Sequence, residues 1–459
     1  MSNIVIIGAG IAGLATAYKL IENHIHDITI LESSDEPGGL SKSIYKNGFI
    51  YDLGPHQIHT ENQTVINFLK QTLKEDLIIE KKQASHWFMG NYLNYPLGIN
   101  DILFGLPFRV SSSCFLDFCK QRLINMFKKQ NNTSFESWVI NHFGKKMYDI
   151  YFGPYTQKVW GKHPSKLAAI CAQERIAVQN LWDVLLSALS KKVVKFSRHY
   201  HLPHSPYQKI FYYPRYGIGQ LANMMSDFIT DHGGKIIYNA KVNNIHKDKA
   251  SFTIHTENKQ ELTSTFLVST MPINELYNNV SCVHDDSHQK QDASLEFRAI
   301  TFVLMEIDRD KLTDNHWIYF PDKDFIFQRT SEFKNFSSDT CPPGQTGICF
   351  EIPCDYKDDI WDMDDARLRE KVVDGACKEH FIQNDWAKGY SVYREKYAYP
   401  TYSLDYKDNL DIMTNYLGKI DNLFTIGRQG TFRYINIDEV MLMGFDVANK
   451  LMNALNLRQ

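Results

Sequence analysis

A short strand-forming run leads directly into a glycine-rich turn near the start of the chain. Residues 3–7 read Asn-Ile-Val-Ile-Ile, and Gly8, Gly10 and Gly13 follow with the spacing Gly-x-Gly-x-x-Gly. The first glycine permits a tight turn, the second lets a pyrophosphate approach the backbone, and the third lets a helix pack closely. The apolar segment 14–21 favours that helix, whose free N–H groups attract phosphates. The pattern predicts a strand–turn–helix unit that binds a dinucleotide.

A second strand with a terminal acid supports this prediction. Residues 28–31 are a short apolar run that ends on Glu32, 19 residues after Gly13. A carboxylate at this place can accept hydrogen bonds from ribose hydroxyls. These residues alone allow either NAD or FAD as the ligand.

The stretch after Glu32 contains a second glycine loop, Gly38-Gly39-Leu40-Ser41, and later the segment 48–56, which ends in Gly54-Pro55-His56. This arrangement resembles the amine oxidase and protoporphyrinogen oxidase group of flavoproteins, in which a Gly-Gly loop runs along the pyrophosphate towards the isoalloxazine ring. The resemblance implies that the chain binds FAD rather than NAD. The cofactor-binding residues that it predicts are Gly8, Gly10, Ile11, Ala12, Gly13, Glu32, Gly39, Leu40, Ser41, Gly54, His56, Gly427 and Arg428.

The pattern typical of an FAD-binding domain returns twice later in the chain. Residues 213–221 open one return, and residues 422–428 read as a strand that leads into a loop. We therefore predict an α/β fold with a discontinuous, Rossmann-like FAD-binding domain, a helical insertion and an antiparallel-sheet substrate domain. The expected boundaries are 1–96, 205–280 and 412–459 for the FAD-binding domain, 97–204 for the helical insertion along the substrate cleft, and 281–411 for the antiparallel sheet.

Four further stretches resemble the UDP-galactopyranose mutases. They are the loop 54–62 around His56, the stretch 155–161 (Tyr-Thr-Gln-Lys-Val-Trp-Gly) with Arg175 downstream, the stretch 328–336 around Arg329, and the stretch 427–434, in which Tyr434 lies six residues after Arg428. In that family the first loop lies beside the flavin ring, the second lies along the substrate cleft, and the third holds an arginine that clamps the diphosphate. The fourth places its arginine near the FAD and its tyrosine on a substrate phosphate. The catalytic residues implied are His56, Arg175, Arg329, Tyr399 and Tyr434, and the substrate-binding residues are Tyr155, Trp160, Arg175, Arg329, Tyr399 and Tyr434.

Three of these assignments have alternatives in the sequence. Arginine suits a diphosphate clamp because its planar guanidinium binds two phosphate oxygens at once, but Arg329 could instead be a strand-edge residue paired with Glu332. Trp160 is by composition more typical of a core than of a sugar-binding wall. Tyr402 is the alternative to Tyr399 as the second phosphate-binding tyrosine.

The resemblance implies an enzyme that interconverts the pyranose and furanose forms of a UDP-galactopyranose-like sugar nucleotide. Reduced FAD would be the active form, with its N5 atom attacking the anomeric carbon. The partners expected are a nucleotide-sugar substrate and an external reductant such as NAD(P)H, and a homo-oligomer is compatible with the sequence. The alternative is an FAD-dependent oxidoreductase of the amine oxidase or protoporphyrinogen oxidase kind, which predicts an apolar pocket. Residues 435–439 depart from the mutase pattern and leave the sugar open.

Composition excludes several other classes of protein. The 459 residues carry a net charge of −3, which gives no global attraction to nucleic acid or to anionic lipid. No apolar run is long enough for a transmembrane helix and the N-terminus does not read as a signal peptide, so a cytoplasmic protein is expected. The eight cysteines are scattered, and we expect neither a disulfide nor a metal site.

Overall fold

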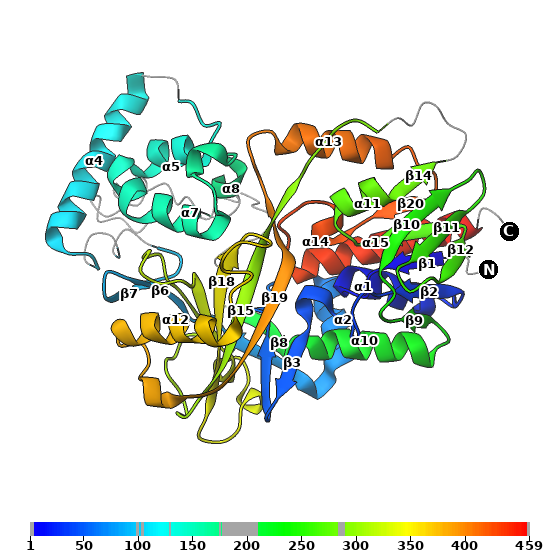
Figure 1. Ribbon diagram of the computed structural model, residues 1–459, viewed down its shortest axis with the longest axis horizontal. Coiled ribbons are helices and arrows are strands. Elements are labelled where there is room, and N and C mark those ends of the chain that lie inside the picture. The colour runs from blue at the N-terminus through cyan, green and yellow to red at the C-terminus, as the bar shows by residue number, and fades with distance from the viewer. Residues whose placement is uncertain are drawn as a thin grey trace.

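The computed structural model describes residues 4–97, 101, 105–127, 130–173, 176, 210–282 and 290–456. Three groups of elements are visible in Figure 1: a parallel sheet with its helices near both termini, a large antiparallel sheet beside it, and a group of helices above the antiparallel sheet. Parallel and antiparallel sheets thus occur together with helices, as the predicted α/β fold class requires.

A five-stranded parallel sheet forms the first group, in the order β20-β13-β1-β2-β9. Its strands are β1 (Ile4–Ile7), β2 (Ile28–Leu31), β9 (Lys235–Ile237), β13 (Phe266–Ser269) and β20 (Leu423–Thr425). Helices α1 (Ile11–Glu22), α2 (Gln63–Leu73), α10 (Gly219–Asp231) and α15 (Ile437–Asn456) pack around it. Strands β1, β2 and β13 are fully buried, as in parallel sheets that are covered on both faces. The sheet therefore unites three segments that lie far apart in the sequence.

Smaller elements complete this group. A four-stranded sheet has the order β12-β11-β10-β14, and two antiparallel strand pairs are β3-β4 and β5-β8. The strands are β3 (Ser43–Lys46), β4 (Phe49–Asp52), β5 (Leu77–Lys81), β8 (Ile210–Pro214), β10 (Val242–Lys247), β11 (Phe252–Thr256), β12 (Glu261–Ser264) and β14 (Val280–Cys282). The helices are α11 (Ile273–Asn279), α13 (Tyr406–Leu417) and α14 (Gly427–Gly430).

A buried carboxylate joins the first and second chain segments of this group. Asp52 accepts hydrogen bonds from the hydroxyls of Ser43 and Tyr213, each at 2.6 Å, and from the backbone N–H of Ile218 at 3.1 Å. Burial raises the pKa of Asp52 to about 6, and the three hydrogen bonds act in the opposite direction. The contacts fix the return of the chain at β8 against β4.

The second group is a seven-stranded sheet in the order β19-β15-β18-β17-β16-β6-β7. Its strands are β6 (Ala84–Phe88), β7 (Asn91–Asn94), β15 (Glu296–Ile307), β16 (Trp317–Tyr319), β17 (Arg329–Glu332), β18 (Thr346–Cys354) and β19 (Ala387–Thr401), with α12 (Asp365–Lys378) on one face. Neighbouring strands are antiparallel except β16 and β6, which are parallel. Strands β6 and β7 come from the segment that the sequence analysis assigned to the FAD-binding domain, and the domain boundaries themselves stay a prediction.

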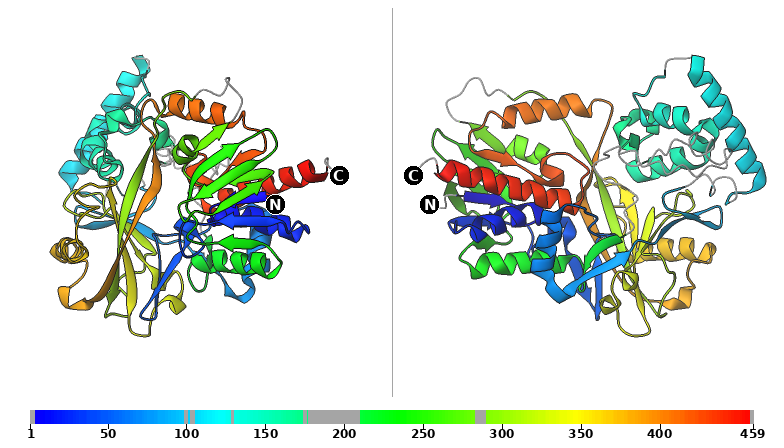
Figure 2. Two further views of the ribbon diagram at one scale, coloured as in Figure 1. Left: turned by 45° about the vertical axis from the view of Figure 1, so that its right-hand side comes forward. Right: turned by 180° about the vertical axis from the view of Figure 1, so that it is seen from behind.

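The third group contains the helices predicted between the first two FAD-binding segments. They are α4 (Phe108–Phe127), α5 (Phe135–Phe143), α6 (Lys145–Met147), α7 (Gly153–Trp160) and α8 (Ile170–Gln173). Helix α5 begins with a reciprocal capping box between Ser134 and Ser137. Helix α4 forms the outer edge of the molecule in every view (Figures 1 and 2). Within the described residues, none of the helices combines the length and the apolar character needed to span a bilayer.

Candidate functional site

The N-terminus of α1 is packed against a turn that only glycine can form. Gly8 has φ +99°, and a Cβ atom on Gly13 would lie 2.1 Å from the carbonyl oxygen of Gly8. Gly10 is the N-cap residue of α1 and provides no side chain there. Ile11 and Ala12 form the first turn of the helix and are buried. Backbone N–H groups therefore face the space before the helix, as a bound pyrophosphate requires.

Two more glycine-containing segments lie against this helix end. Gly38 donates its backbone N–H to the carbonyl of Ala9 at 2.8 Å. Gly39 has φ +56°, and a Cβ atom there would lie 3.5 Å from the Cα atom of Gly10. Gly427, with φ +84°, would bring a Cβ atom within 3.3 Å of the Cβ of Ala12. Leu40 and Ser41 continue the second loop in a short 3-10 helix. The three segments form a cradle lined by backbone, which fits a dinucleotide.

Glu32 lies where the sequence placed it, at the end of β2 and beside the first glycine loop. Its carboxylate accepts hydrogen bonds from the N–H groups of Ala9 at 2.6 Å and Ser34 at 2.9 Å. The hydroxyls of Ser33 and Ser34 donate to the same carboxylate. Glu32 thus ties the glycine loop to the loop after β2, and its contact with a ribose stays a prediction.

His56 follows the turn at Gly54, which has φ +97°. Its Nε2 lies 2.9 Å from the carbonyl of Leu53, so Nε2 carries the proton and Nδ1 is an acceptor. Burial, reinforced by the charges of Arg428 and Arg329, lowers the pKa of His56 to about 3. The imidazole is therefore neutral at physiological pH.

Arg329 and Glu351 form a buried ion pair at the centre of the antiparallel sheet. Nε and Nη2 of Arg329 donate to the two carboxylate oxygens of Glu351 at 2.6 and 2.7 Å. The two residues are direct cross-strand neighbours on β17 and β18. A Cβ atom on Gly54 would lie 3.1 Å from Glu351 Oε1, so the ion pair also contacts the His56 loop.

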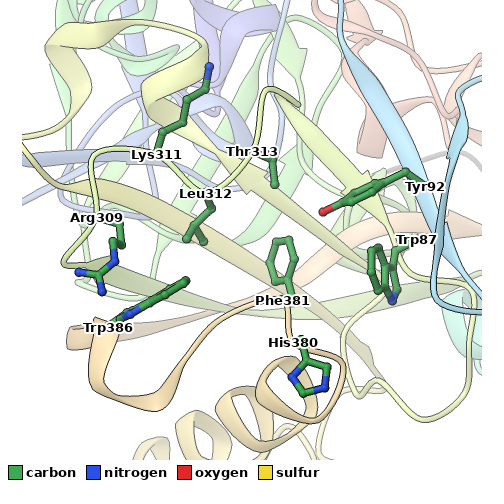
Figure 3. Close-up of a pocket in the computed structure, with 9 residues that line it drawn as sticks. All are labelled: Trp87, Tyr92, Arg309, Lys311, Leu312, Thr313, His380, Phe381 and Trp386. Carbon is green, nitrogen blue, oxygen red and sulfur yellow. The ribbon is translucent and has the colours of Figure 1, made fainter.

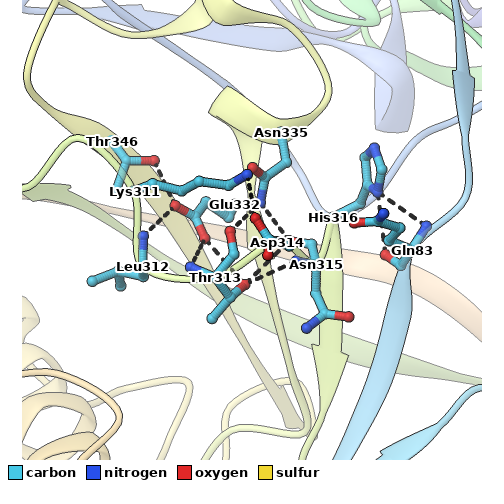
Figure 4. Close-up of polar contacts among 10 residues, drawn as sticks. All are labelled: Gln83, Lys311, Leu312, Thr313, Asp314, Asn315, His316, Glu332, Asn335 and Thr346. Carbon is cyan, nitrogen blue, oxygen red and sulfur yellow. Dashed lines mark hydrogen bonds and ion pairs between the residues drawn. The ribbon is translucent and has the colours of Figure 1, made fainter.

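The alternative pairing of Arg329 with Glu332 is wrong. Side chains three residues apart on a strand point to opposite faces of the sheet. Glu332 accepts hydrogen bonds from the backbone N–H groups of Leu312 and Thr313, at 2.8 and 2.9 Å, and from the hydroxyls of Thr313 and Thr346 (Figure 4). Glu332 stabilises the loop before β16.

Aromatic hydroxyl side chains surround the Arg329 guanidinium. Nη2 of Arg329 donates to the hydroxyl of Tyr399 at 3.3 Å. The rings of Tyr399 and Tyr434 are 5.4 Å apart, and Arg428 lies 4.6 Å from the ring centre of Tyr434. Arg428 also donates to the carbonyl of Ile435. The structure thus brings together both arginines and both predicted phosphate-binding tyrosines. Tyr402 instead accepts the backbone N–H of Tyr434, which favours Tyr399 over the alternative.

Helix α7 places the two predicted substrate-binding aromatics against this cluster. Trp160 is buried and its ring centre is 6.1 Å from that of Tyr399. Tyr155 is 6.5 Å from Tyr319, whose ring lies 5.6 Å from the guanidinium of Arg329. Arg175 lies outside the described residues.

Sequence reasoning missed Glu351, Tyr319 and a tyrosine-histidine wall behind them. Tyr319 is stacked 5.1 Å from His86 and lies 5.0 Å from Tyr95. The hydroxyl of Tyr151 is 2.9 Å from Nδ1 of His86. One signal was available for Glu351: it is the one charged residue in the apolar run 346–354. The other contacts depend on which strands become neighbours.

A separate cavity of about 310 Å³ lies between the β6-β7 hairpin and the segment before β19. Its lining includes the aromatic side chains of Trp87, Tyr92, Phe381 and Trp386 (Figure 3). None of the predicted site residues lines it. All eight cysteines are free thiols, and within the described residues no group of three or more His, Cys, Asp or Glu side chains is arranged to hold a metal ion.

The chain is similar in sequence to several flavoenzymes. The profile of the flavin containing amine oxidoreductase family matches residues 11–451. A UDP-galactopyranose mutase of Mycoplasma genitalium is 23% identical over 98% of this chain and 95% of its own length. A probable UDP-galactopyranose mutase of Klebsiella pneumoniae is 27% identical, over 36% of this chain and 43% of its own. A coproporphyrinogen III oxidase of Staphylococcus aureus is 35% identical over 23% of this chain.

Solved structures share the fold over the whole chain. A reduced UDP-galactopyranose mutase superposes with a TM-score of 0.84, covering 99% of this chain and 94% of its own at 21% identity. A putative protoporphyrinogen oxidase from Exiguobacterium gives 0.72 at 14% identity. These likenesses confirm the predicted resemblance and the fold class.

Proposed function

The chain belongs to the flavin-containing amine oxidoreductase family, and from this premise we propose that it is an FAD-dependent sugar-nucleotide mutase. Its substrate would be a UDP-galactopyranose-like nucleotide sugar, interconverted between pyranose and furanose forms. Full-length similarity to a protein named UDP-galactopyranose mutase supports this proposal. The flavin would be bound in the cradle at the N-terminus of α1, where a Cβ atom at Gly13 has no room.

One observation supports the mutase more than any other, namely the cluster of Arg329, Arg428, Tyr399 and Tyr434. Arg329 donates to the hydroxyl of Tyr399, and the guanidinium of Arg428 lies 6.0 Å from the ring centre of Tyr399 and 4.6 Å from that of Tyr434. Such a set suits a diphosphate, because arginines and hydroxyls stabilise phosphate oxygens and the charge of a leaving group. The amine and porphyrinogen substrates of the alternative carry no diphosphate for these groups to hold.

When bound in the reduced form, the flavin would supply the nucleophile that attacks the anomeric carbon. Arg329 would hold the departing nucleoside diphosphate, and the buried carboxylate of Glu351 fixes the direction of its guanidinium. Tyr399 and Tyr434 would donate hydrogen bonds to the phosphates. Neutral His56 would offer Nδ1 as an acceptor beside the bound cofactor. Buried Trp160 would help to exclude water from the reaction.

The assay that tests the proposal compares reduced and oxidised enzyme. Purified protein is incubated with UDP-galactopyranose, with and without dithionite, and the sugar nucleotides are separated. We expect the furanose form only with reduced flavin, and no net consumption of reductant. The oxidoreductase alternative predicts the reverse: a substrate reduces the flavin stoichiometrically, oxygen is consumed, and UDP-galactopyranose stays unchanged.

A further inference from the structure

The cavity between the β6-β7 hairpin and the segment before β19 has no part in the proposed function. Its volume of about 310 Å³ lies at the lower end of the range for small-molecule sites. Four of its lining side chains are aromatic, namely Trp87, Tyr92, Phe381 and Trp386 (Figure 3). The ring centres of Trp87 and Tyr92 are 4.8 Å apart, so these two side chains support each other. Aromatic side chains pack well against a ring in a ligand.

One wall of the cavity is fixed by hydrogen bonds from behind. Leu312 and Thr313 line the cavity, and their backbone N–H groups donate to Glu332 at 2.8 and 2.9 Å (Figure 4). Asn335 donates its side-chain N–H to the backbone carbonyl of Thr313 at 3.0 Å. Glu332 is buried beneath this wall. The wall is therefore in place before a ligand arrives, which lowers the entropy cost of binding.

The charged side chains that line the cavity are cationic. Its described lining includes Arg309, Lys311 and His380 and no carboxylate. Glu379 and Asp385 lie next to lining residues in the chain but are not part of the lining. The three acids of the segment 308–314 are each paired with a lysine: Asp308 with Lys388 at 3.6 Å, Asp310 with Lys334, and Asp314 with Lys311 at 2.7 Å.

Arg309 is the cation that remains for a ligand. Its Nη1 donates to the backbone carbonyl of Asp308 at 2.9 Å, and its guanidinium lies 4.6 Å from the ring centre of Trp386. Among the residues that the structure describes, Arg309 has no carboxylate partner, and its Nε and Nη2 make no hydrogen bond. These two N–H groups form the fork that binds a carboxylate or a phosphate through two oxygens. Arg309 and Trp386 lie together at one end of the cavity in Figure 3.

We propose that this cavity binds a small organic anion that carries one flat ring. The anionic group is held by Arg309, and the ring packs against Trp386 and Phe381. A neutral ring would leave the guanidinium unused, and an inorganic anion would leave the aromatic surface unused. A phosphate ester and a carboxylate share this chemistry. The proposal does not depend on the reaction at the flavin site, because none of the residues assigned to that site lines the cavity.

Saturation-transfer NMR of the full-length, flavin-loaded protein tests the proposal with simple probes. Phenyl phosphate and benzoate carry a ring and an anion, and benzyl alcohol carries a ring alone. Inorganic phosphate carries an anion alone and is measured by its displacement of phenyl phosphate. We expect phenyl phosphate or benzoate to bind at least about tenfold more tightly than the other two probes, because ring and anion are then both recognised. The tighter of the two distinguishes a phosphate ester from a carboxylate as the natural ligand.

Variants place the binding in this cavity. Arg309→Gln should weaken the binding of phenyl phosphate and benzoate by at least about tenfold, because the charged fork is lost. The matched control, Arg367→Gln, changes an exposed arginine of α12 that does not line the cavity, and it should bind as wild type. Trp386→Leu should weaken phenyl phosphate and benzyl alcohol alike, because both lose the ring surface.

Thermal unfolding and flavin absorbance show that each variant is folded. Absence of phenyl phosphate and benzoate binding overturns the proposal. Equal binding of these probes by wild type and Arg309→Gln also overturns it, because the anion is then held elsewhere, for example by Arg329 and Arg428. Inorganic phosphate that binds as tightly as phenyl phosphate would exclude recognition of the ring, and benzyl alcohol that binds as tightly would exclude recognition of the anion. None of these outcomes changes the result expected from the mutase assay.

Discussion

At the scale of single residues, Glu351 is the group whose role is easiest to isolate. Its carboxylate binds Nε and Nη2 of Arg329, and the pair is almost completely buried. In Glu351→Gln the amide cannot reproduce both charge-assisted bonds, so Arg329 loses its fixed direction. We expect kcat/KM for UDP-galactopyranose to fall by about two orders of magnitude, the range for a misplaced charge stabiliser. Steady-state kinetics with reduced enzyme measures this effect.

Glu332→Gln is the matched control for this prediction. Glu332 is a second buried carboxylate, on the strand next to β18, but its hydrogen bonds go to the loop at Leu312 and Thr313. The control should lose stability and retain its kcat/KM. An equal loss of kcat/KM in the two variants would show that Glu351 acts only through stability.

The contrast between these residues and the glycines shows what a sequence can predict at this scale. The roles of Gly8 and Gly13 follow from backbone geometry within six residues, so the motif predicts them directly. The pairing of Arg329 with Glu351 spans 22 positions and depends on the register of β17 and β18. The role of Arg329 is predicted by the resemblance to a family pattern. Its ion pair with Glu351 can be recognised only when the order and register of the strands are known.

At the scale of elements, α1 contains a glycine, Gly13, although glycine lowers the stability of a helix. The glycine is needed because the helix packs closely against the turn at Gly8. A Cβ atom on Gly13 would lie 2.1 Å from the carbonyl of Gly8, so Gly13→Ala must push α1 away from the turn. We expect a lower unfolding temperature and loss of bound flavin, measured by absorbance after gel filtration. Gly375→Ala in α12 is the control, because its Cβ atom meets nothing within 4 Å. That substitution should stabilise the protein by about 0.5–1 kcal/mol through helix propensity. Retained flavin in Gly13→Ala would contradict the close packing.

The buried histidine of strand β6, His86, makes the free energy of unfolding depend on pH. This histidine is 5% exposed, and burial lowers its pKa to about 3, below the usual value of 6.5. The unfolded chain therefore binds a proton that the folded chain does not, and stability is lost as pH falls from 6.5 towards 3. The slope from one such group is up to about 1.4 kcal/mol per pH unit.

The measurement is urea unfolding of wild type and His86→Gln between pH 7 and 5. Glutamine keeps a hydrogen-bonding partner for Tyr151 but does not titrate. Other buried groups such as Asp52 and His316 titrate equally in both proteins, so the difference in slope isolates His86. The loss of stability on acidification should be smaller in the variant. Parallel curves would mean that His86 binds protons equally in the folded and unfolded protein, so that burial does not lower its pKa.

The hairpin β6-β7 also marks the limit of prediction at the scale of elements. Local patterns identified strands near β1, β2 and β20, and the helix α1. They did not show that β6 pairs with β16, because the apolar content of a strand does not specify its neighbour. Chain order alone favoured the FAD-binding domain for this segment.

At the scale of the whole molecule, the candidate site exists because three groups of elements converge. The parallel sheet supplies the glycine cradle, β17 to β19 supply Arg329 and Tyr399, and α7 supplies Tyr155 and Trp160. Resemblance to a family predicted this convergence, since no local pattern relates residues so far apart. The relative position of the groups must then be held by contacts between them, and two lysines near α7 provide such contacts.

Lys158 is a partly buried tether between the helical group and the antiparallel sheet. Its Nζ donates to the backbone carbonyls of Phe320, Asp322 and Phe327, in the segment between β16 and β17. In Lys158→Met the stem is kept and these buried acceptors lose their donor, at a cost of about 1–3 kcal/mol for each unsatisfied group. We expect faster amide exchange in segment 320–327 and a raised KM, because Tyr155 and Trp160 on the same helix shift against Arg329.

Lys162 provides the matched control, because it makes a comparable link at the surface. Its Nζ lies 2.7 Å from Glu296 at the start of β15, and both side chains are solvent-accessible. Exposed pairs contribute at most about 1 kcal/mol, so Lys162→Met should leave amide exchange and KM close to wild type. If both variants behave alike, burial of the tether has no effect and the cleft is held by apolar packing alone. If only Lys158→Met has a large effect, the amine of Lys158 holds Tyr155 and Trp160 in position relative to Arg329.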